Sequence, residues 1–111
     1  MLGGLNSIEE NAVREFKDIL LDKFGENIMS IKLFGSKARG DYHRESDIDV
    51  LVLIKKGDFR VRDRIVDVSS DLLIKYGVLV SPRVMTEEHF SYLEYLETAF
   101  AKNVIREGVS L

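Results

Sequence analysis

A chain of 111 residues, 45% hydrophobic and 32% charged with a single proline, has the composition of one globular domain spanning residues 1–111. The absence of cysteine excludes disulfides, thiolate catalysis and zinc–cysteine sites. A net charge of −3 does not indicate attraction to nucleic acid, and no apolar run is long enough to span a membrane. We therefore expect a soluble, cytoplasmic protein.

The first predicted element is a helix over about residues 8–24. Ser7 and Glu10 have the spacing of a capping box, in which the two side chains satisfy each other's free backbone donors. Apolar residues then follow at helical spacing, and Gly25 provides the stop. Residues 28–34 are predicted to form the first strand.

A short polar turn bracketed by two glycines, residues 35–40, follows this strand. The run 48–54 is almost wholly apolar and β-branched, which is typical of a central strand covered on both faces. A second helix is predicted from Asp58, its cap, to Gly77, because apolar residues repeat every three or four positions between them.

The end of the chain predicts a third strand and a last helical region. Pro82 lacks an amide hydrogen and places the strand 78–85 at a sheet edge or a bend. Thr86 caps helical structure that runs, with room for a break, to Gly108. This order of elements indicates a single layered α/β (α+β) domain. The sheet should be mixed, because the connection 35–47 is too short for a crossover helix.

Charge is unevenly distributed along the chain. Residues 55–64 carry five basic side chains against two aspartates, and residues 86–99 carry four glutamates without lysine or arginine. Solvated helix faces would explain both segments. The alternative is a basic rim near a phosphate ligand and an acidic surface for a partner.

Two aspartates begin the apolar strand. Asp47 and Asp49 are two residues apart, so both carboxylates should project from the same face. Like charges on a buried strand repel and are costly to desolvate, and a divalent cation such as Mg²⁺ resolves that conflict. The alternative is that Asp47 lies in the preceding loop and only Asp49 needs a partner, such as an arginine.

The glycine turn at the end of the first strand has features of a phosphate cradle. Gly35 lets the backbone approach a ligand closely, Ser36 adds a donor, and Lys37 or Arg39 adds positive charge. A plain turn is the alternative for this segment taken alone. Together with the aspartate pair at the same end of neighbouring strands, it predicts a site for a magnesium-bound nucleoside triphosphate.

Gly35-Ser36, ten intervening residues, and Asp47-Ile48-Asp49 resemble the signature of the DNA polymerase beta-type nucleotidyltransferases. The fuller string GSKARGDYHRESDIDVLV is similar to that of their minimal nucleotidyltransferase (MNT) group. The resemblance implies a mixed-sheet nucleotidyltransferase fold and transfer of a nucleoside monophosphate, usually from ATP, to a hydroxyl. Gly35 and Ser36 would then hold the terminal phosphates, and Asp47 and Asp49 would be the catalytic, magnesium-binding carboxylates.

The resemblance also implies a partner. Many MNT proteins pair with a HEPN-domain toxin, which the MNT antitoxin adenylylates. Catalytic members usually add a third carboxylate from a later strand, but residues 78–85 contain no Asp or Glu. A non-catalytic module that binds nucleotide, a HEPN partner or both is therefore the alternative to an enzyme, and an oligomer is left open.

Overall fold

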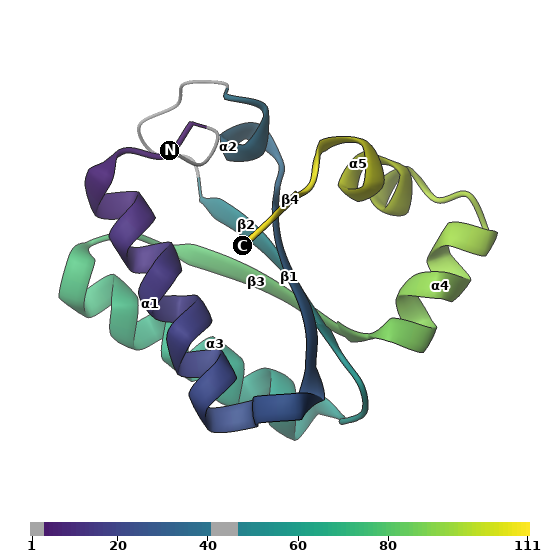
Figure 1. Cartoon of the computed structure of the whole chain (residues 1–111), viewed down its shortest axis with the longest axis horizontal. Coiled ribbons are helices and arrows are strands. Elements are labelled where there is room, and N and C mark those ends of the chain that lie inside the picture. Colours follow the sequence, from purple (N-terminus) through teal and green to yellow (C-terminus); the bar gives the residue numbers. More distant parts are fainter. Residues whose placement is uncertain (1–3, 41–46) are drawn as a thin grey trace.

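The computed structural model describes residues 4–40 and 47–111 of the chain. A four-stranded sheet in the order β3-β2-β1-β4 lies between two pairs of helices (Figure 1). Its strands are β1 (Ile28–Phe34), β2 (Ile48–Ile54), β3 (Val80–Thr86) and β4 (Val109–Ser110). β1 pairs antiparallel with both β2 and β4, whereas β2 pairs parallel with β3. The predicted mixed sheet is confirmed.

Strand β2 is an inner strand of the sheet, and its side chains are buried on both faces. Val50 and Val52 belong to the larger core cluster, and Leu51 and Leu53 to a smaller cluster. β3 forms an edge, as Pro82 predicts, although it begins two residues later than expected. β4 was not predicted, since a strand of two residues has no readable alternation.

Helix α1 (Ser7–Phe24) begins one residue earlier than predicted. The capping box consists of Asn6 and Glu9 rather than Ser7 and Glu10. Asn6 Oδ1 accepts from the Glu9 amide at 2.8 Å, and Glu9 Oε1 accepts from the Asn6 amide at 3.0 Å. The prediction was wrong by one position because two overlapping pairs of residues have capping-box chemistry. A 3-10 turn over Gly25–Asn27 leads into β1.

Helix α3 (Phe59–Tyr76) has the predicted ends, with the Asp58 side chain accepting from the Arg60 amide and Gly77 in the left-handed conformation. α1 and α3 lie together on one face of the sheet (Figure 1). The larger core cluster fills the space beneath them, and its largest fully buried side chains include Phe16, Leu33 and Ile65.

The other face of the sheet carries α4 (Glu87–Tyr95) and α5 (Ala99–Glu107), capped by Thr86 and Thr98. The helices are separated by a break at which Glu97 adopts φ 55°. They pack on the smaller core cluster, which contains Leu51, Leu53, Phe90, Ala101 and Val104. None of the described helices has the length and apolar character needed to cross a membrane.

Candidate active site

The antiparallel pairing of β1 and β2 brings the two halves of the sequence motif together. Phe34 pairs with Asp49, so Gly35 follows directly beside the carboxylate. Gly35 has φ 78°, and a Cβ built on it would lie 2.6 Å from Asp49 Oδ2. Only glycine therefore fits here, both for its backbone conformation and because Asp49 occupies the space of a side chain. The ten-residue spacer lies mostly in 41–46, outside the described residues.

The two aspartates occupy different positions in the element. Asp47 is exposed and precedes the first residue of β2, as the alternative allowed, whereas Asp49 is half-buried within the strand. Burial raises the pKa of Asp49, and the negative charge of Asp47 raises it further. Arg83 and Arg39 oppose this shift without reversing it. The surroundings of Asp49 therefore disfavour its charged form.

This donor set fits Mg²⁺ only in part. Two carboxylates are oxygen ligands of the kind magnesium prefers, and the ion keeps several water or phosphate ligands besides. Among residues 4–40 and 47–111, no group of three or more His, Cys, Asp or Glu side chains gathers around one point. Asp47 and Asp49 could therefore hold a magnesium ion that arrives with the phosphates of a nucleotide.

The glycine turn continues into a one-turn helix, α2 (Ser36–Arg39). The amides of Ala38 and Arg39 both donate to the Gly35 carbonyl at 3.1 Å. Ser36 is therefore the first helical residue and directly follows Gly35, whose missing side chain leaves room for Asp49. This placement brings the predicted serine donor and the predicted metal ligands to one end of the sheet.

Lys37 has a different environment from the one the sequence predicted. Its Nζ lies 2.9 Å from Glu9 Oε2, and the two side chains are only 3% and 9% exposed. The Gly4 amide also donates to the Lys37 carbonyl at 2.6 Å. Lys37 thus ties α2 to the start of α1, and this buried ion pair competes with any contact to phosphate.

Arg39 is held by a residue that sequence reasoning missed. Its Nη1 donates to Glu107 Oε2 at 3.0 Å, across 68 positions of sequence. Glu107 ends α5, and its side chain is only 13% exposed. The closing segment NVIREGV contains this residue, but no local pattern connects it with the glycine turn.

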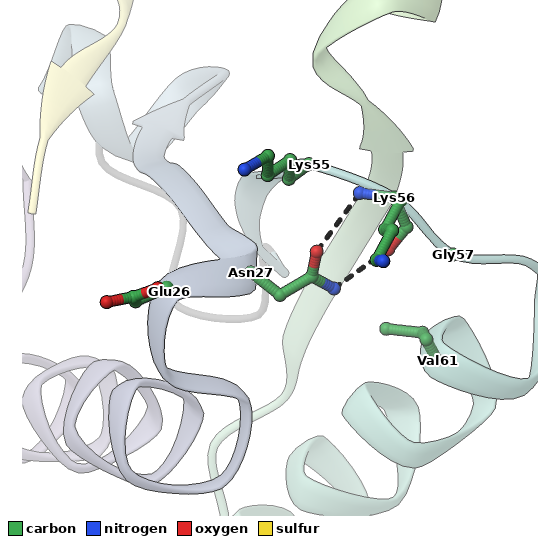
Figure 2. Close-up of a pocket in the computed structure, with 6 residues that line it drawn as sticks. All are labelled: Glu26, Asn27, Lys55, Lys56, Gly57 and Val61. Atoms are coloured by element: carbon green, nitrogen blue, oxygen red, sulfur yellow. Dashed lines mark hydrogen bonds between the residues drawn. The ribbon is translucent and has the colours of Figure 1, made fainter.

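The basic segment 55–64 lies away from these residues. Lys55 and Lys56 follow the end of β2 opposite to Asp47 and Asp49, and a hollow of about 550 Å³ opens there (Figure 2). The Asn27 amide group bonds both backbone groups of Lys56, at 2.8 and 3.0 Å. The segment is therefore not a rim of the candidate site.

The mixed sheet, the glycine–serine turn and the aspartate pair together define the architecture of a nucleotidyltransferase. The sequence profile of the nucleotidyltransferase domain family matches residues 13–110. The chain belongs to this family.

Relatives of known name agree with this assignment. The chain is 43% identical over 100 residues to the putative protein adenylyltransferase MJ0604 of Methanocaldococcus jannaschii, a match covering 90% of this chain and 94% of the relative. The putative protein adenylyltransferase MJ0141 of the same organism is 33% identical over 100 residues, covering 89% and 94%. The fold is similar to that of a chain in a crystal structure of a toxin–antitoxin with AMP-PNP. That match has a TM-score of 0.61 and 25% identity, and covers 91% of this chain and 70% of that one.

Proposed function

We propose that this nucleotidyltransferase transfers AMP from ATP to a protein hydroxyl and acts as the antitoxin of a HEPN-type toxin. The observation that carries the proposal is that Asp49 fills the space where a side chain of Gly35 would lie, which places the glycine turn next to the aspartate pair. The adenylyltransferase names of the relatives and the toxin–antitoxin neighbour support the substrate and the partner.

In this proposal the triphosphate tail lies against the α2 turn. Ser36 donates a hydrogen bond to a terminal phosphate, and Arg39 adds a charge held in place by Glu107. Asp47 and Asp49 would hold Mg²⁺, which would offset the negative charge of the phosphates. The absence of a Cβ at Gly35 leaves the space that the Asp49 carboxylate fills.

The acceptor hydroxyl attacks the phosphorus next to the nucleoside. The bond from that phosphorus to the bridging oxygen breaks, and pyrophosphate leaves. The hydroxyl proton must pass to a base, and β3 carries no Asp or Glu at any of its positions. We therefore propose that the partner protein supplies this base together with the acceptor, which we take to be a tyrosine.

The partner would bind at the outer surface of α4 and of the turn that follows it. This surface consists of Tyr92, Tyr95 and Leu96, which are 56%, 82% and 50% exposed, and the exposed glutamates Glu94 and Glu97. Large exposed aromatic side chains are typical of association surfaces, and the acidic residues around them favour a basic partner.

Adenylylation is tested by intact-mass spectrometry of the product of the neighbouring gene, incubated with this chain, ATP and magnesium. We expect a mass increase of one or more AMP groups, and none with Asp47→Asn plus Asp49→Asn. That double variant should remain folded and become somewhat more stable, because the repulsion between the carboxylates disappears. A complex without any mass increase would favour the non-catalytic alternative, to which the absence of a third acid points. The absence of a complex would remove the partner.

The docking surface is tested by reversing its charge. Glu94→Lys plus Glu97→Lys should weaken association with the partner, and the remaining affinity should depend less on salt. Asp18→Lys plus Asp22→Lys is the matched control, since it makes the same change of charge on exposed positions of α1. Equal losses in both variants would show a general charge effect and remove the assignment of α4.

A further inference from the structure

Arg83 lies on β3, the strand next to Asp49 on the side away from the α2 turn. Within the sheet, Asp49 pairs with Phe34 on β1 and with Ser81 on β3. Arg83 follows Ser81 by two residues, so its side chain leaves the same face of the sheet as Asp49. The Asp49 carboxylate therefore has the glycine turn after β1 on one side and Arg83 of β3 on the other.

The guanidinium of Arg83 lies over the Phe100 ring of an aromatic cluster. Its Cζ lies 5.8 Å from the centroid of the Phe100 ring of α5. Phe100 itself packs edge-to-face against Phe34 and Phe90, with ring centroids 5.6 and 6.4 Å away. A cation over an aromatic face is favoured electrostatically, and a ring fixed by two neighbours limits where the guanidinium can lie.

Arg83 retains donors for a ligand. Arg39 pairs with Glu107, but over residues 4–40 and 47–111 no carboxylate lies within ion-pair distance of Arg83. Its charge nevertheless acts on Asp49, more strongly than that of Arg39. An exposed arginine on the strand next to Asp49, with hydrogen-bond donors to spare, is suited to a phosphate.

Resting on the proposed nucleotide transfer, we propose that Arg83 binds the phosphate group next to the nucleoside, across Asp49 from Ser36. The reasoning is one of position: if the terminal phosphates lie at α2 and the metal ligands lie between, the first phosphate falls on the β3 side. A guanidinium there would also stabilise negative charge that develops on the transferred phosphate. Arg83 would then supply positive charge on the strand where a third carboxylate is usually found.

Calorimetric titration with AMP and with ATP, each with magnesium, tests this assignment. AMP keeps only the phosphate next to the nucleoside, so Arg83→Gln should weaken both ligands by a similar factor, about tenfold or more. Ser36→Ala should weaken ATP by about tenfold and leave AMP nearly unchanged. Arg64→Gln is the matched control, because Arg64 also stacks on a ring, with its Cζ 4.8 Å from the Phe24 centroid, but lies on α3. It should change neither affinity.

Two results would overturn the assignment. Unchanged affinities in Arg83→Gln would show that Arg83 does not touch the nucleotide. Loss of ATP affinity alone would place it at the terminal phosphates instead. Arg83→Lys keeps the charge but not the planar fork, so it should show a smaller loss of the same pattern. If the unaltered protein binds neither nucleotide, the proposed function fails as well, which distinguishes that case from failure of Arg83 alone.

Discussion

At the scale of single residues, the candidate site depends on how Asp49 is surrounded. Burial and the charge of Asp47 raise the pKa of its carboxyl group, while Arg83 and Arg39 act in the opposite direction. Gly35 sets its position, because a side chain there would collide with Oδ2. The neighbours of Asp49 thus disfavour its ionised form. Carboxylates in such surroundings are common at sites where a bound ligand balances the charge.

Gly35→Ala should damage both stability and nucleotide binding. The positive φ alone costs about 1–3 kcal/mol for a residue with a side chain, and the Cβ would also push Asp49 aside. Gly77→Ala is the control, since φ is 68° there but nothing lies within 4 Å of the added atom. Urea unfolding should show losses in both variants, and ATP titration a loss only at Gly35. Normal ATP binding by Gly35→Ala would contradict the assigned site.

Glu107→Gln should weaken ATP binding through Arg39. The variant keeps the shape of the side chain but removes the charge that orients the guanidinium. Stability should fall by only about 0.5–1 kcal/mol, because Arg39 is partly exposed. Glu10→Gln, which removes the pair between Glu10 and Arg14 on α1, is the control for loss of an ion pair elsewhere. Equal ATP affinity in the two variants would show that Glu107 has no role in positioning Arg39.

At the scale of elements, the one-turn helix α2 is too short to be stable alone and depends on its attachments. Lys37 fastens it to α1 through Glu9, and Arg39 fastens it to α5 through Glu107. The two attachments come from opposite faces of the sheet. The one-turn helix α2 is thus positioned by both helical layers, although it consists of only four residues.

Lys37→Met should destabilise the protein by about 3–5 kcal/mol, because it leaves the buried Glu9 carboxylate without the opposite charge it faces. Glu9→Gln should also destabilise the protein, because it removes one of the groups that face the buried Lys37 ammonium. The double variant should lose less than the sum, since neither charge then remains. Urea unfolding of all four proteins measures this coupling. ATP titration of Lys37→Met gives a second result: retained binding would assign Lys37 to structure, and a large loss in a folded variant would restore the predicted contact with phosphate.

At the scale of the whole molecule, the two faces of the sheet are unequally covered. The larger core cluster lies under α1 and α3, which are eighteen residues each, and the smaller cluster lies under α4 and α5, which are nine each. The candidate site lies at one end of the sheet, where α2 meets the end of α5. The proposed partner surface belongs to the thinner layer.

This asymmetry predicts unequal local stability. Amide hydrogens of α4 and α5 should exchange faster than those of α1, α3 and β2, because fewer buried apolar contacts must be broken to expose them. Hydrogen exchange followed by mass spectrometry measures the difference. Binding of the partner should slow exchange in α4 specifically. Uniform protection across both layers would show that the molecule opens only as one unit.

The sequence by itself determined the elements whose signals are local. The apolar run of β2 and the Asp58 and Gly77 ends of α3 could be predicted, because caps and periodicity act within a few residues. A break in the last helical region was allowed for, but its position before α5 was not predicted. The motif of Gly35, Ser36, Asp47 and Asp49 could also be recognised, because its residues lie close together in the sequence. Its spacing resembles the signature of a known family.

Only the tertiary structure decided what the charged side chains of the site contact. Lys37 and Arg39 lie two residues apart, yet one is buried against Glu9 and the other is paired with Glu107. Arg83 could not be connected with Asp49 before the parallel pairing of β2 and β3 was known. Ion pairs and cross-strand neighbours depend on distances between remote segments, and those distances are set by packing of the sheet and its two helical layers rather than by any local pattern.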